Sequence, residues 1–346
     1  MRTVMRKLTS QIDLTEREIK TTIMGIKEDR IDEVQIAGFL VALLMKGPTV
    51  EEIVAIAKTM REVCLPLKPE VNGELIDTCG TGGGFPTFNV STAVAITTAA
   101  GGLYVAKHGS RSIAHSSGSA DAFEALGVEI KLTSRQAEKL IEKTGIAFVN
   151  AAYFHLLMGK IWQPENKLGI KTVFFTIIGP LINPARARCH INGVYQPQLV
   201  KKVAQVWAKL DHKHILVVHG MDGLDEISLV GETHIAEVKD GHIDDYTIVP
   251  EDVGLKRCKI EQLNGGSPED NAKIIRDIFK GKEKGPKKDM VILNSAGAFV
   301  AGGKVKNLKE GVETAREIIE SGKAYQKLEE LVKASHSINN ETYRSN

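Results

Sequence analysis

The first seventy residues carry apolar positions at helical spacing and no alternation of the kind that strands show. Ile53, Ile56 and Met60 fall on one face of a helix in the clearest example. Thr15 and Thr49 each precede a Glu by three positions, the pattern of a capping box at a helix start. This part of the chain is therefore predicted to be entirely helical.

After residue 70 the pattern changes to short apolar runs that alternate with amphipathic segments. Strands are expected at 74–78, 103–106, 145–149 and 214–218, and helices from 91, at 119–126, at 135–143 and at 199–210. The predicted fold class is α/β: a small all-helical N-terminal domain and a large domain with a mostly parallel sheet covered by helices. Ligands of such sheets bind at the carboxyl ends of the strands. The polar residues 336–346 are expected to fray.

Three segments suited to bind anions lie within about fifty residues, each beside a predicted strand end or helix start. They are the loop Gly80-Thr81-Gly82-Gly83-Gly84, the helix start Asn89-Val90-Ser91-Thr92 and the turn Lys107-His108-Gly109-Ser110-Arg111. Each segment taken alone has an ordinary alternative explanation: a flexible loop for the first, a helix cap for the second and a solvated turn for the third. Together they favour a ligand with several phosphates. They match neither a Walker A loop nor a dinucleotide-binding fingerprint.

Two further groups carry chemistry near predicted strand ends. Asp225 and Glu226 are adjacent carboxylates, which supply the hard oxygen ligands that Mg²⁺ requires, although an exposed acidic turn explains them equally well locally. His108 is either a structural histidine or a group that lines a pocket and accepts a proton, and the sequence does not decide between them.

Composition excludes several classes of protein. The 346 residues carry a net charge of +2, which gives no support for a nucleic-acid-binding surface. The longest apolar run, residues 36–45, falls short of the roughly 20 residues that span a membrane. Four cysteines without metal-ligand spacing are typical of a reducing cytoplasm, which is the expected location.

The motifs CGTGGG, FNVSTA, AKHGSRS and SSGSADAFEALG, in residues 79–127, identify a family resemblance. Residues 218–228 and the pair of segments 168–170 and 179–184 agree with it. The chain resembles the anthranilate phosphoribosyltransferase family among the nucleoside phosphorylase-like glycosyltransferases. The resemblance implies a discontinuous helical domain of residues 1–70 and about 155–190, an α/β phosphoribosyl-binding domain of residues 71–154 and 191–335, and a homodimer.

The resemblance also implies an activity and a set of binding residues. Phosphoribosyl is transferred from phosphoribosyl pyrophosphate to anthranilate with Mg²⁺ as cofactor, releasing pyrophosphate in tryptophan biosynthesis. Phosphoribosyl pyrophosphate would be bound by Gly80, Thr81, Gly82, Gly83, Asn89, Ser91, Thr92, Lys107 and Ser119. The metal would be bound by Ser91, Asp225 and Glu226. The small aromatic amine acceptor would be bound by Gly80, His108, Ser110 and Glu165.

The departures from the family pattern concentrate in the acceptor half. Gly84 stands where the family has an acid, Ser110 where it has Asn, and Glu165 where it has an Arg that faces the anthranilate carboxylate. A Glu facing the pocket would repel a carboxylate, so Lys167 and Lys171 are alternative sources of the missing charge. Two other hypotheses stay open: a different amine or nucleobase acceptor, and a non-catalytic paralogue that binds nucleic acid.

Overall fold

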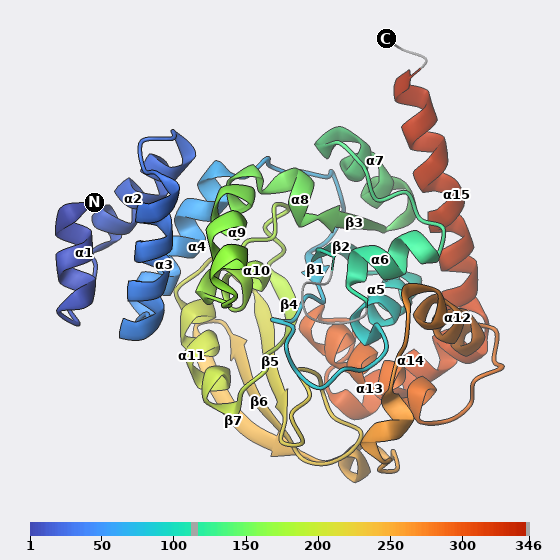
Figure 1. Ribbon diagram of the computed structural model, residues 1–346. Helices are drawn as coiled ribbons and strands as arrows, with labels where there is room; N and C mark the ends of the chain where they lie inside the picture. The colour runs from blue at the N-terminus through green and yellow to red at the C-terminus, as the bar shows by residue number, and fades with distance from the viewer. Residues whose placement is uncertain (112–116, 344–346) are drawn as a thin grey trace.

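The computed structural model describes residues 1–111 and 117–343, with side chains described up to residue 338. Its N-terminal part is helical, as predicted, and forms one side of the molecule in Figure 1. The capping boxes predicted at Thr15 and Thr49 are present, and Asp32 forms a third. The helices are α1 (Arg2–Thr9), α2 (Glu16–Lys27), α3 (Glu33–Lys46) and α4 (Val50–Val63).

A seven-stranded sheet in the order β3-β2-β1-β4-β5-β6-β7 forms the centre of the larger part. The first five strands in this order are parallel, and the last two pairings, β5–β6 and β6–β7, are antiparallel, which confirms the mostly parallel sheet. The strands are β1 (Leu75–Asp77), β2 (Tyr104–Gly109), β3 (Ile146–Asn150), β4 (Cys189–Gly193), β5 (His214–Gly220), β6 (Thr233–Lys239) and β7 (His242–Ile248). The sequence reasoning missed β4, β6 and β7.

Helices cover both faces of the sheet, and the alternation of side chains along the central strand β5 shows how. Leu216 and Val218 belong to one apolar cluster, while Ile215 and Val217 belong to the other. The first cluster packs under α5 (Val90–Ala100), α6 (Ser119–Ala125), α7 (Ser134–Thr144), α12 (Pro268–Phe279), α13 (Pro286–Ala301), α14 (Leu308–Glu320) and α15 (Lys323–Tyr343). The second joins the N-terminal helices to the sheet through α11 (Pro197–Ala208). Short 3₁₀ turns, η2 (Pro250–Val253) and η3 (Ile260–Leu263), precede α12.

The segment after β3 leaves the sheet and returns to the N-terminal helices. It forms α8 (Ala151–Phe154), α9 (Leu156–Leu168), the 3₁₀ turn η1 (Val173–Phe175) and α10 (Ile178–Leu181). Helix α9 contacts α2 and α3, and α10 contacts α4. This is the packing that a discontinuous helical domain requires. Its boundaries stay a prediction, because the same apolar cluster continues through α11 to the sheet.

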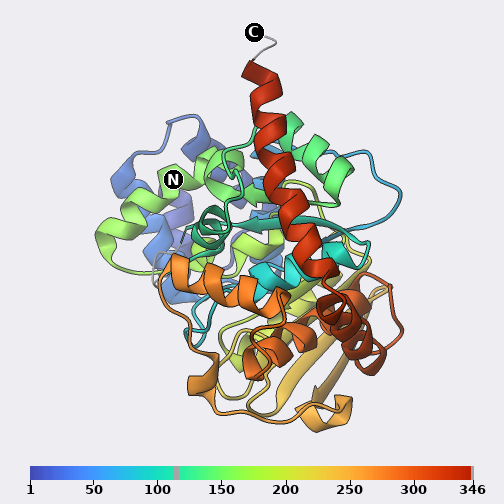
Figure 2. The same cartoon turned by 90° about the vertical axis from the view of Figure 1, so that its right-hand side faces the viewer.

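Residues 336–343, part of the segment expected to fray, belong to a helix in the structure. Helix α15 runs to Tyr343, and its last turns project from the body in Figures 1 and 2. Ser335 and Ile338 are buried, and the Ser335 hydroxyl accepts a hydrogen bond from the Glu129 amide. These contacts hold the helix where composition alone indicated a loose end. No helix in the described part of the chain is long and apolar enough to cross a membrane.

Candidate active site

A cleft of about 790 Å³ opens at the carboxyl ends of the parallel strands. One wall comes from the loops after β1, β2 and β5 and from the start of α5, and the other comes from α8 to α10. Segments far apart in the sequence therefore meet where the topology predicts a ligand. Of the predicted site residues, those lining the cleft are Gly80, Thr81, Gly82, Gly83, Asn89, Ser91, Lys107, His108, Ser110, Ser119, Asp225 and Glu226. Thr92 and Glu165 do not line it.

The glycine loop after β1 is fixed against β4 and against the loop that carries Asp225. The Thr81 amide donates to the Gly193 carbonyl at 2.8 Å, and the Thr81 hydroxyl accepts from the Tyr195 amide at 3.2 Å. A Cβ at Gly193 would lie 1.6 Å from the Asp225 carbonyl oxygen, and a Cβ at Gly84 would lie 2.5 Å from Asp225 Oδ1. The two glycines therefore leave the space that Asp225 fills.

The start of α5 places one of its two hydroxyl side chains in the cleft. Ser91 lines the cleft, whereas the neighbouring Thr92 is fully buried, since adjacent helix positions point about 100° apart. The Thr92 hydroxyl is buried without a hydrogen-bond partner among the described residues, and its contact with a phosphate stays a prediction. Asn89 lines the cleft, but its Oδ1 accepts hydrogen bonds from Ser117 Oγ and Asn271 Nδ2. Asn89 therefore holds the cleft wall together.

The end of β2 contributes a buried cation and a neutral histidine. Lys107 is 1% exposed, and its Nζ donates to the His108 carbonyl at 2.7 Å. His108 Nδ1 lies 3.1 Å from the Gly179 carbonyl, which can only accept, so Nδ1 carries the proton. Burial, together with the charges of His155 and Lys107, lowers the pKa of His108 well below its usual value. Its Nε2 is a buried acceptor without a partner among residues 1–111 and 117–343.

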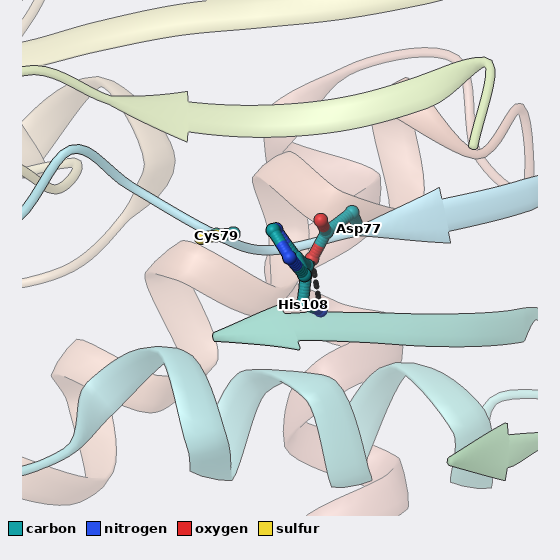
Figure 3. A group of neighbouring side chains, drawn as sticks. All are labelled: Asp77, Cys79 and His108. Carbon is teal, nitrogen blue, oxygen red and sulfur yellow. Dashed lines mark hydrogen bonds between the residues drawn. The ribbon is translucent and has the colours of Figure 1, made fainter. Parts of the chain in front are cut away.

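His108 also lies in a group with Asp77 and Cys79, shown in Figure 3, whose ligand atoms lie within 4.8 Å of one another. The Asp77 carboxylate accepts hydrogen bonds from the amides of Thr78 and His108 and from Asn183 Nδ2. Burial raises the pKa of the Cys79 thiol to about 12, so it stays protonated. The group ties β1 to β2, and we assign it a structural role.

The two carboxylates after β5 are oxygen donors of the kind that Mg²⁺ binds. Asp225 and Glu226 line the cleft from the loop after β5, and Ser91 lines it from the first turn of α5. Burial, followed by the charge of Asp225, raises the pKa of Glu226 well above its usual value. Glu226 Oε2 is buried and has no partner within the described residues. A bound cation would satisfy this oxygen and offset the repulsion, so the donor set fits Mg²⁺.

Glu165 does not occupy the position expected for it. It lies on α9 and is 3% exposed, with its carboxylate turned to the start of η1. The Thr172 amide donates to Oε1 at 2.5 Å, and the Thr172 hydroxyl donates to Oε2 at 3.1 Å. Burial raises the pKa of Glu165. The prediction that Glu165 contacts the acceptor is corrected: the carboxylate fastens the loop beyond its own helix.

Sequence reasoning missed the apolar and aromatic wall opposite the glycine loop. Trp162 from α9 and Phe174 and Phe175 from η1 line the cleft beside Lys171. His155 packs its ring against His108, with centroids 5.1 Å apart. The clustering of aromatic residues between 153 and 175 was the available signal. The cleft thus joins a polar, phosphate-sized end to an aromatic end.

Comparison with known families gives two matches that together cover most of the chain. Residues 72–325 match the a/b domain of a glycosyl transferase family, and residues 2–64 match the helical bundle domain of a glycosyl transferase family. The boundary between these matches falls in the linker between α4 and β1.

Curated relatives and solved structures agree with those matches. The chain is 46% identical to the anthranilate phosphoribosyltransferase of Petrotoga mobilis over 95% of both chains. Its identity to the enzyme of that name from Acetivibrio thermocellus is 46% over 97% of both. The anthranilate phosphoribosyltransferase of Thermus thermophilus superposes with a TM-score of 0.90 at 40% identity, covering 96% of this chain and 99% of that one. The Saccharomyces cerevisiae enzyme, solved with PRPP and Mg, superposes with a TM-score of 0.87 at 27% identity, covering 97% of each.

Proposed function

The chain belongs to the anthranilate phosphoribosyltransferase family, and we propose that it transfers phosphoribosyl from phosphoribosyl pyrophosphate to anthranilate, releasing pyrophosphate in tryptophan biosynthesis. The observation that carries the proposal is the composition of the cleft. A glycine loop, Ser91 and buried Lys107 stand at one end together with Asp225 and Glu226, and aromatic side chains stand at the other.

The polar end suits the ribose-phosphate and pyrophosphate groups. Loss of pyrophosphate leaves positive charge on C1 of the ribose and adds negative charge to the leaving group. The glycine-loop amides and Lys107 are placed to bind that negative charge. Asp225, Glu226 and Ser91 would hold Mg²⁺, which when bound neutralises charge on the pyrophosphate. Burial of Lys107 strengthens its attraction for a phosphate because water is excluded.

The other end suits a flat aromatic amine. Trp162, Phe174 and Phe175 offer apolar surface, and Ser110 and Gly80 lie along the wall towards the polar end. His108 holds its proton on Nδ1, so its Nε2 can accept a hydrogen bond from the attacking amine as a positive charge develops there. The low pKa of His108 keeps this nitrogen unprotonated near neutral pH.

A different amine or nucleobase is the second candidate acceptor, and the position of Glu165 is the observation that favours it. This carboxylate takes the place of a cation and is fastened to Thr172 away from the cleft. A panel of anthranilate, other aromatic amines and nucleobases, assayed for pyrophosphate release with phosphoribosyl pyrophosphate and Mg²⁺, separates the candidates. Preference for anthranilate supports the proposal. If only another amine or nucleobase is turned over, that compound is the acceptor. Tight binding of single-stranded DNA without pyrophosphate release would support the non-catalytic hypothesis.

We also propose that the enzyme is a homodimer joined through its N-terminal helices. The apolar segment 36–45 buries only part of its surface: Met45 is 74% exposed and Leu44 40%. Val34 on the same helix is 82% exposed, and nearby in sequence Ile12 is 52% exposed. Such exposed apolar surface is typical of an interface. Light scattering that gives a monomer mass at all concentrations would refute the dimer.

The proposed location is a reducing cytoplasm. All four cysteines are free thiols in the structure. Disulfides are rare in that compartment, and the substrates of the proposed reaction are small metabolites. Localisation of a tagged chain by cell fractionation tests this: recovery in the soluble cytoplasmic fraction is expected, and recovery outside the cell would contradict it.

A further inference from the structure

Four cations line the cleft, and two of them are already engaged by the protein. Lys107 donates to the His108 carbonyl at the polar end, and Arg111 forms ion pairs with Asp121 and Glu124. Lys131 and Lys171 form no ion pair within residues 1–111 and 117–343. These two lysines are therefore the lining cations without an ion-pair partner, although the charge of Lys171 also acts on the Glu165 carboxylate.

The aromatic end of the cleft distinguishes the two lysines. Lys171 begins a short segment that also supplies Phe174, Phe175 and Thr176 to the lining. Lys131 enters with Ile130 from the loop between α6 and α7, which adds no aromatic side chain. If the aromatic ring of an acceptor packs on Phe174 and Phe175, the cation that the same segment supplies to the cleft is Lys171.

Glu165 determines where this segment lies. Its carboxylate accepts from both the amide and the hydroxyl of Thr172, the residue directly after Lys171. The Thr172 hydroxyl also accepts from the Phe174 amide at 3.4 Å, which starts η1. The main chain beside Lys171 is consequently fixed by a buried, doubly bonded carboxylate.

We propose that Lys171 binds the carboxylate of the acceptor and selects aromatic amino acids over neutral aromatic amines, with Glu165 as its positioning residue. The inference rests on the proposed phosphoribosyl transfer and specifies its acceptor. Lys171 is exposed, so solvent screens its attraction, and its removal should weaken carboxylate binding about two- to fivefold.

The test compares Lys171→Met with Lys171→Arg, Lys131→Met and Lys167→Met. Lys167 is the matched control, because it lies outside the cleft lining and pairs with Glu33 on α3. The assays are the Michaelis constants for anthranilate and phosphoribosyl pyrophosphate, and competitive inhibition by benzoate, which keeps the carboxylate, and by aniline, which lacks it.

We expect Lys171→Met to raise the Michaelis constant for anthranilate and to weaken benzoate inhibition about two- to fivefold, with aniline inhibition and the phosphoribosyl pyrophosphate constant unchanged. Lys171→Arg should restore both, and Lys167→Met should match the wild type. Glu165→Gln should also weaken benzoate inhibition, but by less than Lys171→Met does. An unchanged benzoate constant in Lys171→Met, or the loss in Lys131→Met instead, would overturn the assignment while wild-type turnover of anthranilate upholds the proposed function. Absence of that turnover would overturn both.

Discussion

Substituting Gly193 by Ala should lower activity far more than stability, because Gly193 packs directly against the main chain of Asp225, a proposed metal ligand. An alanine Cβ would lie 1.6 Å from the Asp225 carbonyl oxygen and 2.5 Å from its carbonyl carbon. Main-chain atoms cannot rotate away as the end of a side chain can. The loop carrying Asp225 must therefore move by roughly 1.5–2 Å to reach an ordinary van der Waals distance.

The size of the effect follows from that displacement. A misplacement of about 1 Å in a catalytic arrangement costs on the order of a hundredfold in rate. Turnover of Gly193→Ala should therefore fall about a hundredfold or more. Overpacking a close contact costs about 1–3 kcal/mol, which the large apolar core can absorb. The protein should stay folded, with a thermal midpoint lowered by several degrees.

Pyrophosphate release at saturating substrates and a Mg²⁺ titration provide the assay, and circular dichroism confirms the fold. Gly84→Ala should lose less activity, since the nearest main-chain atom to its Cβ, the Asp225 nitrogen, lies 2.8 Å away, and the closer Asp225 Oδ1, at 2.5 Å, belongs to a movable side chain. Gly38→Ala is the control, because its Cβ would meet only the flexible end of Met5, at 3.3 Å. Activity of Gly193→Ala within threefold of wild type would refute the claim that this contact positions Asp225.

Three further predictions concern charge. Lys107→Ala should raise the Michaelis constant for phosphoribosyl pyrophosphate roughly ten- to a hundredfold, since a charge-assisted bond contributes about 1.5–3 kcal/mol, and an unchanged constant would remove Lys107 from the site. Asp225→Asn with Glu226→Gln should abolish Mg²⁺-dependent turnover while thermal melting shows a folded protein. Burial lowers the pKa of His155 from 6.5 to about 4, so the unfolded chain takes up the proton first as pH falls. The free energy of unfolding should therefore drop by about 3 kcal/mol between pH 7 and 4 on this account, and denaturant titrations of His155→Phe should show a smaller drop.

The polar half of the cleft was predictable because the sequence signals for it are local. The glycine loop, Ser91 and Lys107 each follow a strand or begin a helix that the apolar pattern indicates. Parallel strands place their carboxyl ends together, so the pattern also predicts that these segments meet. Thr92 shows the limit of that reasoning, since one helix position decides between the cleft and the core.

The acceptor half depended on tertiary contacts that sequence spacing does not reveal. Counting along the family pattern led to Glu165, but its direction is set by two hydrogen bonds from Thr172. The steric role of Gly193 depends on β4, a strand that was not predicted. The antiparallel β6–β7 hairpin did have a local sequence signal, the Asp-Gly dipeptide at residues 240–241, which favours a two-residue hairpin turn. In the structure both residues have the positive φ that this turn requires.

The most direct test of the central claim follows anthranilate and pyrophosphate in the same reaction of the purified wild-type protein. Anthranilate fluorescence and released pyrophosphate are recorded with phosphoribosyl pyrophosphate, with and without Mg²⁺. The account predicts that one anthranilate disappears for each pyrophosphate released, and that chelation of Mg²⁺ stops both. Pyrophosphate release without loss of anthranilate, or no release from a folded protein with Mg²⁺ present, would contradict it.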